Sequence, residues 1–181
     1  MNLKSNLLAT ALVVACGTLA LAPAANAADG TITINGKVLS STCTVSNATA
    51  GNVAVTLPDV VYSAFTTSGS VAGLTPFSLN LTGCPTTPSG VVVAAQFSGA
   101  NIDASTGALK NGTGTSNVEV QLTNSSGTAI NLNTNPTPVN ATISGTGTAT
   151  LAYQAQYYQP SATAITAGTV NTSVSFTLTY N

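Results

Sequence analysis

The chain ends in a clearly alternating sequence. Residues 168–181 read Gly-Thr-Val-Asn-Thr-Ser-Val-Ser-Phe-Thr-Leu-Thr-Tyr-Asn, and every second position from 174 to 180 is apolar. A period of two is typical of a β-strand that buries one face. Val, Thr, Phe and Tyr also favour strands. The C-terminal segment is therefore predicted to be an apolar strand.

The same alternation recurs in short segments along the chain. Turn-forming residues lie between them, as at 85–90, 107–116 and 124–127. No segment after residue 30 shows a helical period. The pattern predicts an all-β sandwich. The alternating positions are Ile32, Ile34 and Val38; Val53, Val55 and Leu57; Phe77, Leu79 and Leu81; residues 91–97; Val118, Val120 and Leu122; Ile130 and Leu132; and Leu151, Tyr153 and Tyr157.

Charged residues are scarce. They make up 4% of the 181 residues, with a net charge of −1, and the chain contains neither Arg nor His. Nucleic-acid binding is disfavoured because there is no basic surface to neutralise phosphates. Catalysis that depends on His is excluded, and Asp59 and Asp103 are more simply turn residues than a catalytic pair. We therefore expect no enzyme activity, no cofactor and no metal site.

The N-terminus has the layout of a secretory signal peptide. A short positively charged start is followed by an apolar run from Leu7 to Leu21 and by Ala25-Asn26-Ala27, a cleavage signal of small residues. We expect residues 1–27 to be removed, leaving one domain at 28–181. Val13-Val14-Ala15-Cys16 resembles a lipid-attachment site. That alternative is disfavoured because it would leave an unusually short apolar run.

The predicted mature chain holds two cysteines, Cys43 and Cys84. An even number of cysteines in an exported protein indicates a disulfide. Closing a loop of this length would stabilise the fold by about 4 kcal/mol. A redox or metal pair is disfavoured because the two residues lack the C-x-x-C spacing and no His is present.

Both ends of the mature chain carry an apolar strand pattern. One lies at residues 28–41, before Cys43, and the other at residues 168–181. An apolar strand left at a sheet edge recruits other strands. Two alternatives remain open from the pattern alone: both strands pair within a closed sandwich, or the protein assembles by strand addition.

Several short motifs resemble the chaperone–usher (type 1) fimbrial major subunit family. The C-terminus has the family's Gly168, fourteenth from the end, and its penultimate Tyr180. The order and spacing of the motifs carry the resemblance across the mature chain. The further matching segments are residues 34–38 before Cys43, 77–84 ending at Cys84, 117–122, 127–130 and 153–158.

The resemblance implies a fold and a mechanism. Such subunits have an immunoglobulin-like sandwich that lacks its final strand. A periplasmic chaperone lends a strand to the open groove, and at the outer-membrane usher the N-terminal extension of the next subunit replaces it. Repeated strand addition gives a head-to-tail filament on the cell surface, which supports adhesion.

The resemblance also implies roles for individual residues. The donor strand is expected within residues 28–40, with Gly30, Ile32 and Ile34 facing a neighbour's groove. The chaperone is expected to hold the carboxylate of Asn181. The other residues expected at the acceptor groove are Gly168, Val170, Val174, Phe176, Leu178 and Tyr180.

Rival functions are a minor adaptor subunit of a fimbria, a tip adhesin and a free-standing secreted immunoglobulin-like binding domain. A tip adhesin needs an additional lectin domain, for which 154 mature residues leave no room. A free-standing domain predicts a complete sandwich whose first residues are dispensable.

Overall fold

A computed structural model describes residues 32–34, 36–136 and 139–181. The predicted signal peptide at 1–27 and the predicted donor residue Gly30 lie outside these residues. The chain divides into two compact units, residues 1–36 and 37–181, which we describe separately. In the first unit, the described residues Ile32 and Ile34 belong to no helix or strand, and their side chains are 89% and 88% exposed.

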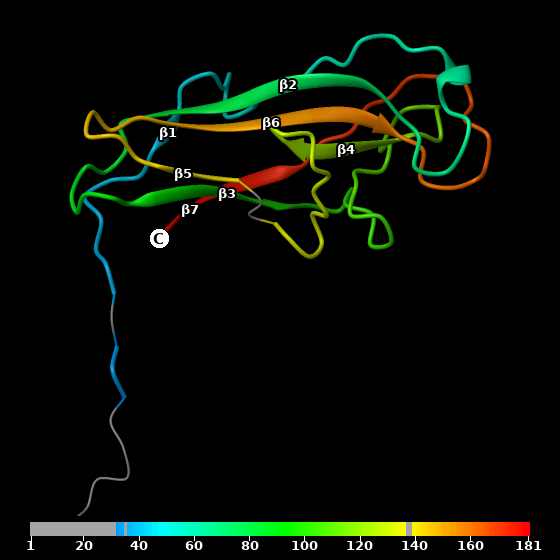
Figure 1. Ribbon diagram of the computed structural model, residues 1–181. Coiled ribbons are helices and arrows are strands. Elements are labelled where there is room, and N and C mark those ends of the chain that lie inside the picture. Colours follow the sequence, from blue (N-terminus) through cyan, green and yellow to red (C-terminus); the bar gives the residue numbers. More distant parts are fainter. Residues whose placement is uncertain (1–31, 35, 137–138) are drawn as a thin grey trace, which may run out of the picture. The chain divides into compact units, whose positions relative to one another are not determined.

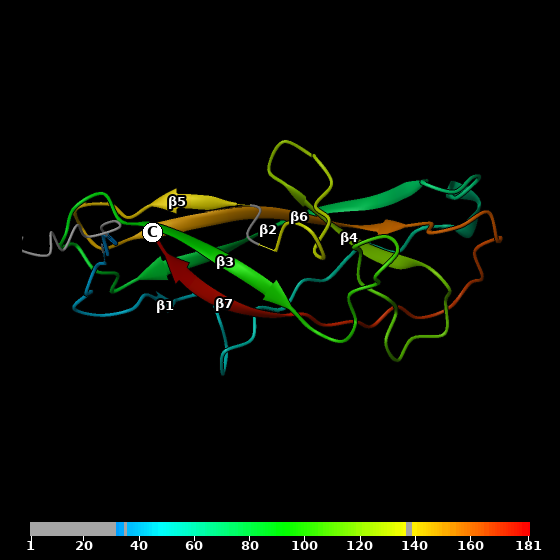
Figure 2. The same cartoon turned by 90° about the horizontal axis from the view of Figure 1, so that it is seen from below.

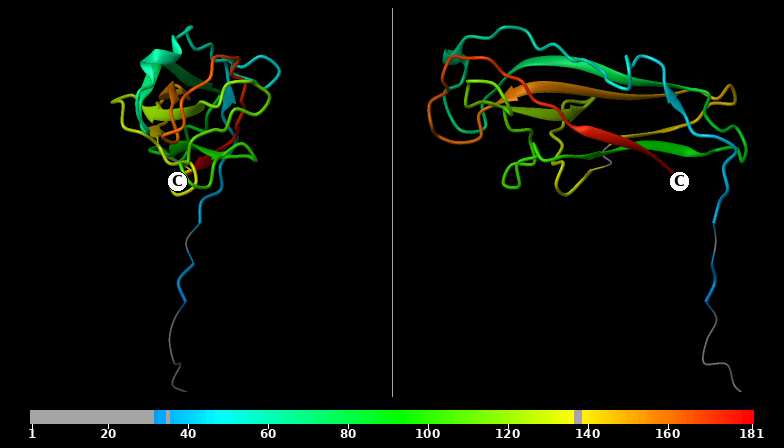
Figure 3. Two further views of the ribbon diagram at one scale, coloured as in Figure 1. Left: turned by 90° about the vertical axis from the view of Figure 1, so that its right-hand side faces the viewer. Right: turned by 180° about the vertical axis from the view of Figure 1, so that it is seen from behind.

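Nearly all the regular secondary structure in the described part of the second unit is antiparallel strand. The elements are β1 (Thr44–Val45), the short 3-10 helix η1 (Tyr62–Ala64), β2 (Val71–Thr82), β3 (Val92–Ser98), β4 (Glu119–Asn124), β5 (Asn140–Thr142), β6 (Ala149–Tyr158) and β7 (Ser175–Tyr180). One sheet has the order β1-β2-β6-β4 and the other the order β5-β3-β7. The two sheets form the two layers of a sandwich (Figures 1 and 3).

Strand register places the apolar residues between the two layers. In the first sheet, Leu79 of β2 lies opposite Leu151 of β6, and Phe77 lies opposite Tyr153. Successive strand residues point to opposite faces, so these pairs share the inner face. The main core contains Leu79, Leu81, Val91, Val93, Ala95, Phe97, Leu122 and Leu151.

Tyr153 links the two sheets. Its ring stacks on Phe77 in its own sheet at 5.5 Å and meets Phe97 of the opposite sheet edge-on at 5.3 Å. Such aromatic pairs stabilise a core beyond the apolar area they bury. The Tyr153 hydroxyl is also buried and has no hydrogen-bond partner among the described residues.

The strand predictions are confirmed for 77–81, 91–97, 118–122, 151–157 and 175–180. They differ at other positions. Residues 168–174, 53–57 and 130–132 form no regular strand, and β5 was not predicted. The segment before β7 bonds instead to a loop, as described below. The chain is all-β, as predicted. Within the described residues, no helix has the length and apolar character needed to cross a membrane.

Candidate site at the open edge of β7

The C-terminal strand β7 lies at the border of its sheet. It pairs with β3 along its whole length, from Ser98 opposite Ser175 to Val93 opposite Tyr180. No described strand pairs with its other side, and Figure 2 shows β7 along one border of this layer. Its outward N–H and C=O groups are therefore available to a further strand.

The apolar face of β7 is only partly covered. Phe176 and Leu178 are half-buried, whereas Val93 and Ala95 on the adjacent strand β3 are fully buried. All four belong to or pack against the main core. The side chains at this edge thus contact the core on one side and lack apolar cover on the other. The half-buried residues of the C-terminal segment are Val170, Val174, Phe176, Leu178 and Tyr180.

Residues from the N-terminal part of the second unit also pack against the main core and are only partly covered. Val45, Val53 and Leu57 are half-buried and pack against the main cluster. Residues 53–57 have no ladder partner within the described chain. Incomplete burial on both sides is what a sandwich short of one strand would show.

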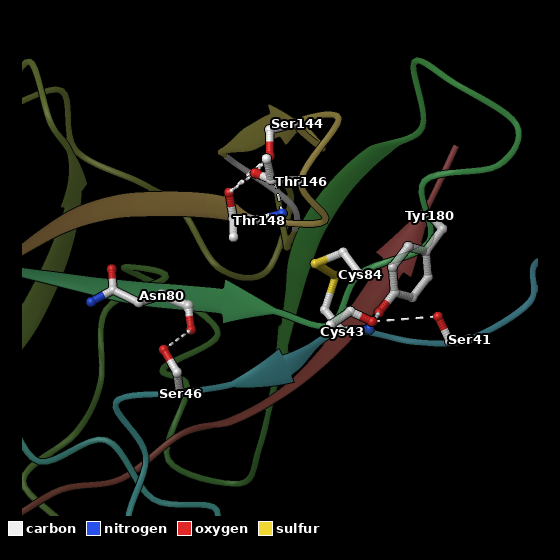
Figure 4. The surroundings of a disulfide bond; sticks show 10 residues. Ser41, Cys43, Ser46, Asn80, Cys84, Ser144, Thr146, Thr148 and Tyr180 are labelled. Carbon is white, nitrogen blue, oxygen red and sulfur yellow. Dashed lines mark hydrogen bonds between the residues drawn. A yellow bond between two sulfur atoms is a disulfide. The ribbon is translucent and has the colours of Figure 1, made fainter.

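Tyr180 is hydrogen-bonded next to the disulfide. The bond between Cys43 and Cys84 is present, as predicted. The amide of Cys43 donates a hydrogen bond of 2.7 Å to the hydroxyl oxygen of Tyr180 (Figure 4). The end of β7 is therefore tied to the segment that leads into β1.

Gly168 permits a close approach between two backbone segments. A Cβ at this position would lie 2.8 Å from the backbone nitrogen of Ser116 and would also collide with Thr115. Only glycine fits such a contact without a shift of the backbone. The structure therefore places Gly168 against the loop at 114–116.

Asn111 holds the same contact by hydrogen bonds. Its side-chain amide donates to the carbonyl oxygens of Ser116 (2.7 Å) and Thr169 (2.9 Å). Its carbonyl oxygen accepts from the amides of Gly114 (3.0 Å) and Asn171 (2.8 Å). Asn111 was not predicted to be a site residue, although it lies in the turn-forming segment 107–116.

Three of the few charged residues, Asp103, Lys110 and Glu119, lie close enough to influence one another. Burial raises the pKa of Glu119, which a hydrogen bond of 2.7 Å from Thr106 partly opposes. Hydrogen bonds from Ser105 lower the pKa of Asp103, and the charge of Lys110 acts in the same direction. The described residues contain no cluster of His, Cys, Asp and Glu able to hold a metal ion.

Fold and site together define a class: an all-β sandwich subunit with a partly covered, unpaired C-terminal strand. Residues 57–181 match the family model for type-1 fimbrial protein, A. The chain belongs to this family of chaperone–usher fimbrial subunits, and that prediction is confirmed.

Two similar proteins cover most of the chain. The major fimbrial subunit SMF-1 of Stenotrophomonas maltophilia is 42% identical over 90% of this chain and 99% of its own length. The F17 fimbrial protein of Escherichia coli is 41% identical over 84% of this chain and 87% of its own length. These relatives are structural fimbrial proteins rather than enzymes.

Solved structures support the fold. The P pilus rod subunit PapA superimposes with a TM-score of 0.58 at 18% identity, covering 78% of this chain and all of PapA. A chain of a chaperone–usher pilus superimposes with a TM-score of 0.55 at 21% identity, covering 88% of this chain and 100% of that chain. The fold is the immunoglobulin-like sandwich of these subunits, which lacks its final strand.

Proposed function

We propose that this chain is a pilus-rod subunit that polymerises head-to-tail by donor-strand exchange. The observation that carries the proposal is the unpaired edge of β7, whose apolar face is only half-buried. The donor strand comes from residues 28–40 of the next copy. Gly30, Ile32 and Ile34 of that copy face the core beside Phe176 and Leu178.

The energetics favour such an exchange. Ile32 and Ile34 are almost fully exposed before assembly, and burying an aliphatic side chain contributes about 1.5–3 kcal/mol. The added strand also forms main-chain hydrogen bonds along β7. Because donor and acceptor surfaces differ, the contact does not close on itself and generates a filament.

The remaining partners follow from the family. Residues 1–27 direct export, a periplasmic chaperone holds the open subunit through β7 and the carboxylate of Asn181, and an outer-membrane usher replaces the chaperone by the next subunit. The fimbria at the cell surface then supports adhesion. The similarity to a major fimbrial subunit extends over most of both chains, which favours a rod subunit over a minor adaptor subunit. The open edge of β7 disfavours a free-standing domain.

The test compares residues 28–181 with residues 41–181 on gels run with and without boiling. The longer chain should give a ladder of polymers that disappears on boiling, and the shorter chain should remain monomeric. A ladder from the shorter chain would refute strand exchange. Ile32→Ser with Ile34→Ser should also abolish the ladder, whereas Thr33→Ser, on the opposite face of the strand, should leave it intact.

A further inference from the structure

The second unit carries an exposed apolar surface that the proposed function does not use. Its most exposed members are Val61 and Tyr62, at 69% and 64%. The neighbouring residues Ser63, Thr66, Thr67 and Ser68 are polar and exposed, so a concentration of apolar side chains here indicates an interaction site. We define the end patch as Val60, Val61, Tyr62, Val71 and Leu74.

The end patch lies around η1 and the beginning of β2. Val71 pairs with Tyr158 at the end of β6. Gly73 has a φ of 70°, and a Cβ there would lie 3.0 Å from the ring of Tyr157 and 3.4 Å from Val60. Val60 therefore lies close to the start of β2 and the end of β6.

This end of the unit is also where the segment leading into β7 begins. A small second core of Phe65, Val118 and Ile165 packs against both Tyr157 and Val170. The C-terminus, which follows β7, lies toward the opposite end of the unit (Figure 1). Tyr180 there is hydrogen-bonded to the disulfide-linked Cys43. The second core thus connects the end patch, through Tyr157, to Val170 in the segment that leads into β7.

We propose that the end patch docks a second copy of this chain, namely the copy that supplies the donor strand. This inference rests on the proposed function. Every strand pair of both sheets is antiparallel, and antiparallel pairing is the more stable arrangement. A donor strand antiparallel to β7 ends beside the N-terminal side of β7. The body of the donor copy then lies against the end patch.

The chemistry of the two surfaces is complementary. The donor segment leads into its own domain through Lys37 and Val38, and Val38 is 95% exposed. Next to the end patch is Asp59, which is exposed. Burial raises the pKa of the Tyr157 hydroxyl, and the charge of nearby Asp59 acts in the same direction. Val38 of the donor copy contacts the end patch, and Lys37 of the donor copy pairs with Asp59 of the acceptor.

A second copy is the occupant favoured by the arrangement of the polymer. Strand exchange already holds two copies together, so a further contact between them forms at a high effective concentration. The net charge of −1 produces little repulsion between copies. The end patch is also continuous with the strand-accepting edge through Val170 and the second core.

Zero-length coupling tests the contact in assembled polymers of residues 28–181. A carbodiimide joins a Lys amine to a carboxylate only where the two touch, so treated polymers should give a ladder that survives boiling. Mass spectrometry should find Lys37 joined to Asp59 of another copy. Lys37→Arg, which keeps the charge but cannot be coupled in this way, and Asp59→Asn should each reduce the boiling-resistant dimer at least fivefold.

Matched controls separate the possible outcomes. Lys110→Arg and Asp103→Asn should leave the coupled ladder unchanged. If the unboiled ladder forms but coupling is the same in Asp59→Asn as in the original chain, the end-patch contact is refuted and strand exchange stands. If no unboiled ladder forms in the original chain, strand exchange itself fails, and the end-patch contact fails with it.

The apolar part of the contact has a separate readout. Tyr62→Ser should leave the ladder of unboiled polymers visible but lower the temperature at which the polymers dissociate. Ser68→Ala, an exposed substitution outside the end patch, should not change that temperature. An equal dissociation temperature for Tyr62→Ser and the original chain would overturn the apolar contact.

Discussion

The amide of Cys43 and the hydroxyl of Tyr180, 137 residues apart in sequence, form a hydrogen bond of 2.7 Å. The bond joins the two segments on either side of the open face: the one that leads from the donor segment into β1, and the end of β7. The disulfide at Cys43 fixes the first of these to the end of β2. The penultimate tyrosine thus has a role within the subunit, in addition to the role proposed for it in chaperone capture.

Tyr180→Phe should therefore lower the free energy of unfolding without removing apolar contact. The Cys43 amide is partly buried and would lose its partner, which costs about 1–2 kcal/mol. Urea unfolding of residues 28–181 measures the change. Tyr62→Phe, at an exposed tyrosine, is the matched control. Equal midpoints for Tyr180→Phe and the original chain would show that the hydrogen bond is unimportant.

Gly168→Ala should destabilise the segment before β7. The new Cβ would press on the backbone of Ser116 and on Thr115, and overpacking of this kind costs about 1–3 kcal/mol. Asn111→Ala should have a similar effect because it removes four hydrogen bonds to the same contact. Gly145→Ala, where a Cβ meets nothing within 4 Å, is the control. If Gly168→Ala and Gly145→Ala changed the unfolding temperature equally, the close packing around Gly168 would be contradicted.

Period-two patterning was sufficient to predict the long paired strands. Leu79, Phe97 and Leu151 are core residues as well as members of alternating runs, so pattern and packing agree there. The pattern failed at residues 168–174, which alternate but lack a ladder. Their backbone groups form hydrogen bonds with Asn111 and its loop. This contact is tertiary, so the local alternation of residues cannot predict it.

The candidate site was only partly accessible from sequence. The apolar alternation in β7 identified Phe176 and Leu178, and the even cysteine count identified the disulfide. Asn111 was missed because two of its four hydrogen bonds reach Thr169 and Asn171, 58 and 60 residues away in sequence. The end patch was missed because Val60, Val61 and Tyr62 are consecutive and carry no periodicity.

Tyr153→Phe should leave stability unchanged or raise it by about 1 kcal/mol. The Tyr153 hydroxyl is buried without a hydrogen-bond partner among the described residues, and an unsatisfied buried polar group is costly. Phenylalanine keeps the ring contacts with Phe77 and Phe97. The measurement is urea unfolding, with Tyr153→Leu as the variant that loses those contacts. A loss of more than about 1 kcal/mol in Tyr153→Phe would show that the hydroxyl has a partner in solution.

Glu119 should make the subunit more stable as the pH falls towards 4.5. Burial raises the pKa of Glu119 in the folded chain above its ordinary value of 4.5. The folded state therefore holds this proton more tightly than the unfolded state does. The resulting stabilisation is complete below 4.5 and is lost as the pH rises through the raised pKa.

Asp103 should change the stability of the subunit with pH in the opposite direction. Hydrogen bonds from Ser105 lower its pKa below the ordinary 3.8, so its contribution to the stability of the fold is present above 3.8 and is lost as the pH falls through the lowered value.

Urea unfolding of residues 28–181 between pH 4 and 8 separates the effects of Glu119 and Asp103. Glu119→Gln should be more stable than the original chain at pH 7, and the difference should shrink as the pH falls. Asp103→Asn should keep most of the slope caused by Glu119, because burial is the main cause of the raised Glu119 pKa and the charge of Asp103 a smaller one. A constant difference between Glu119→Gln and the original chain across this range would mean that Glu119 titrates alike in the folded and unfolded chains.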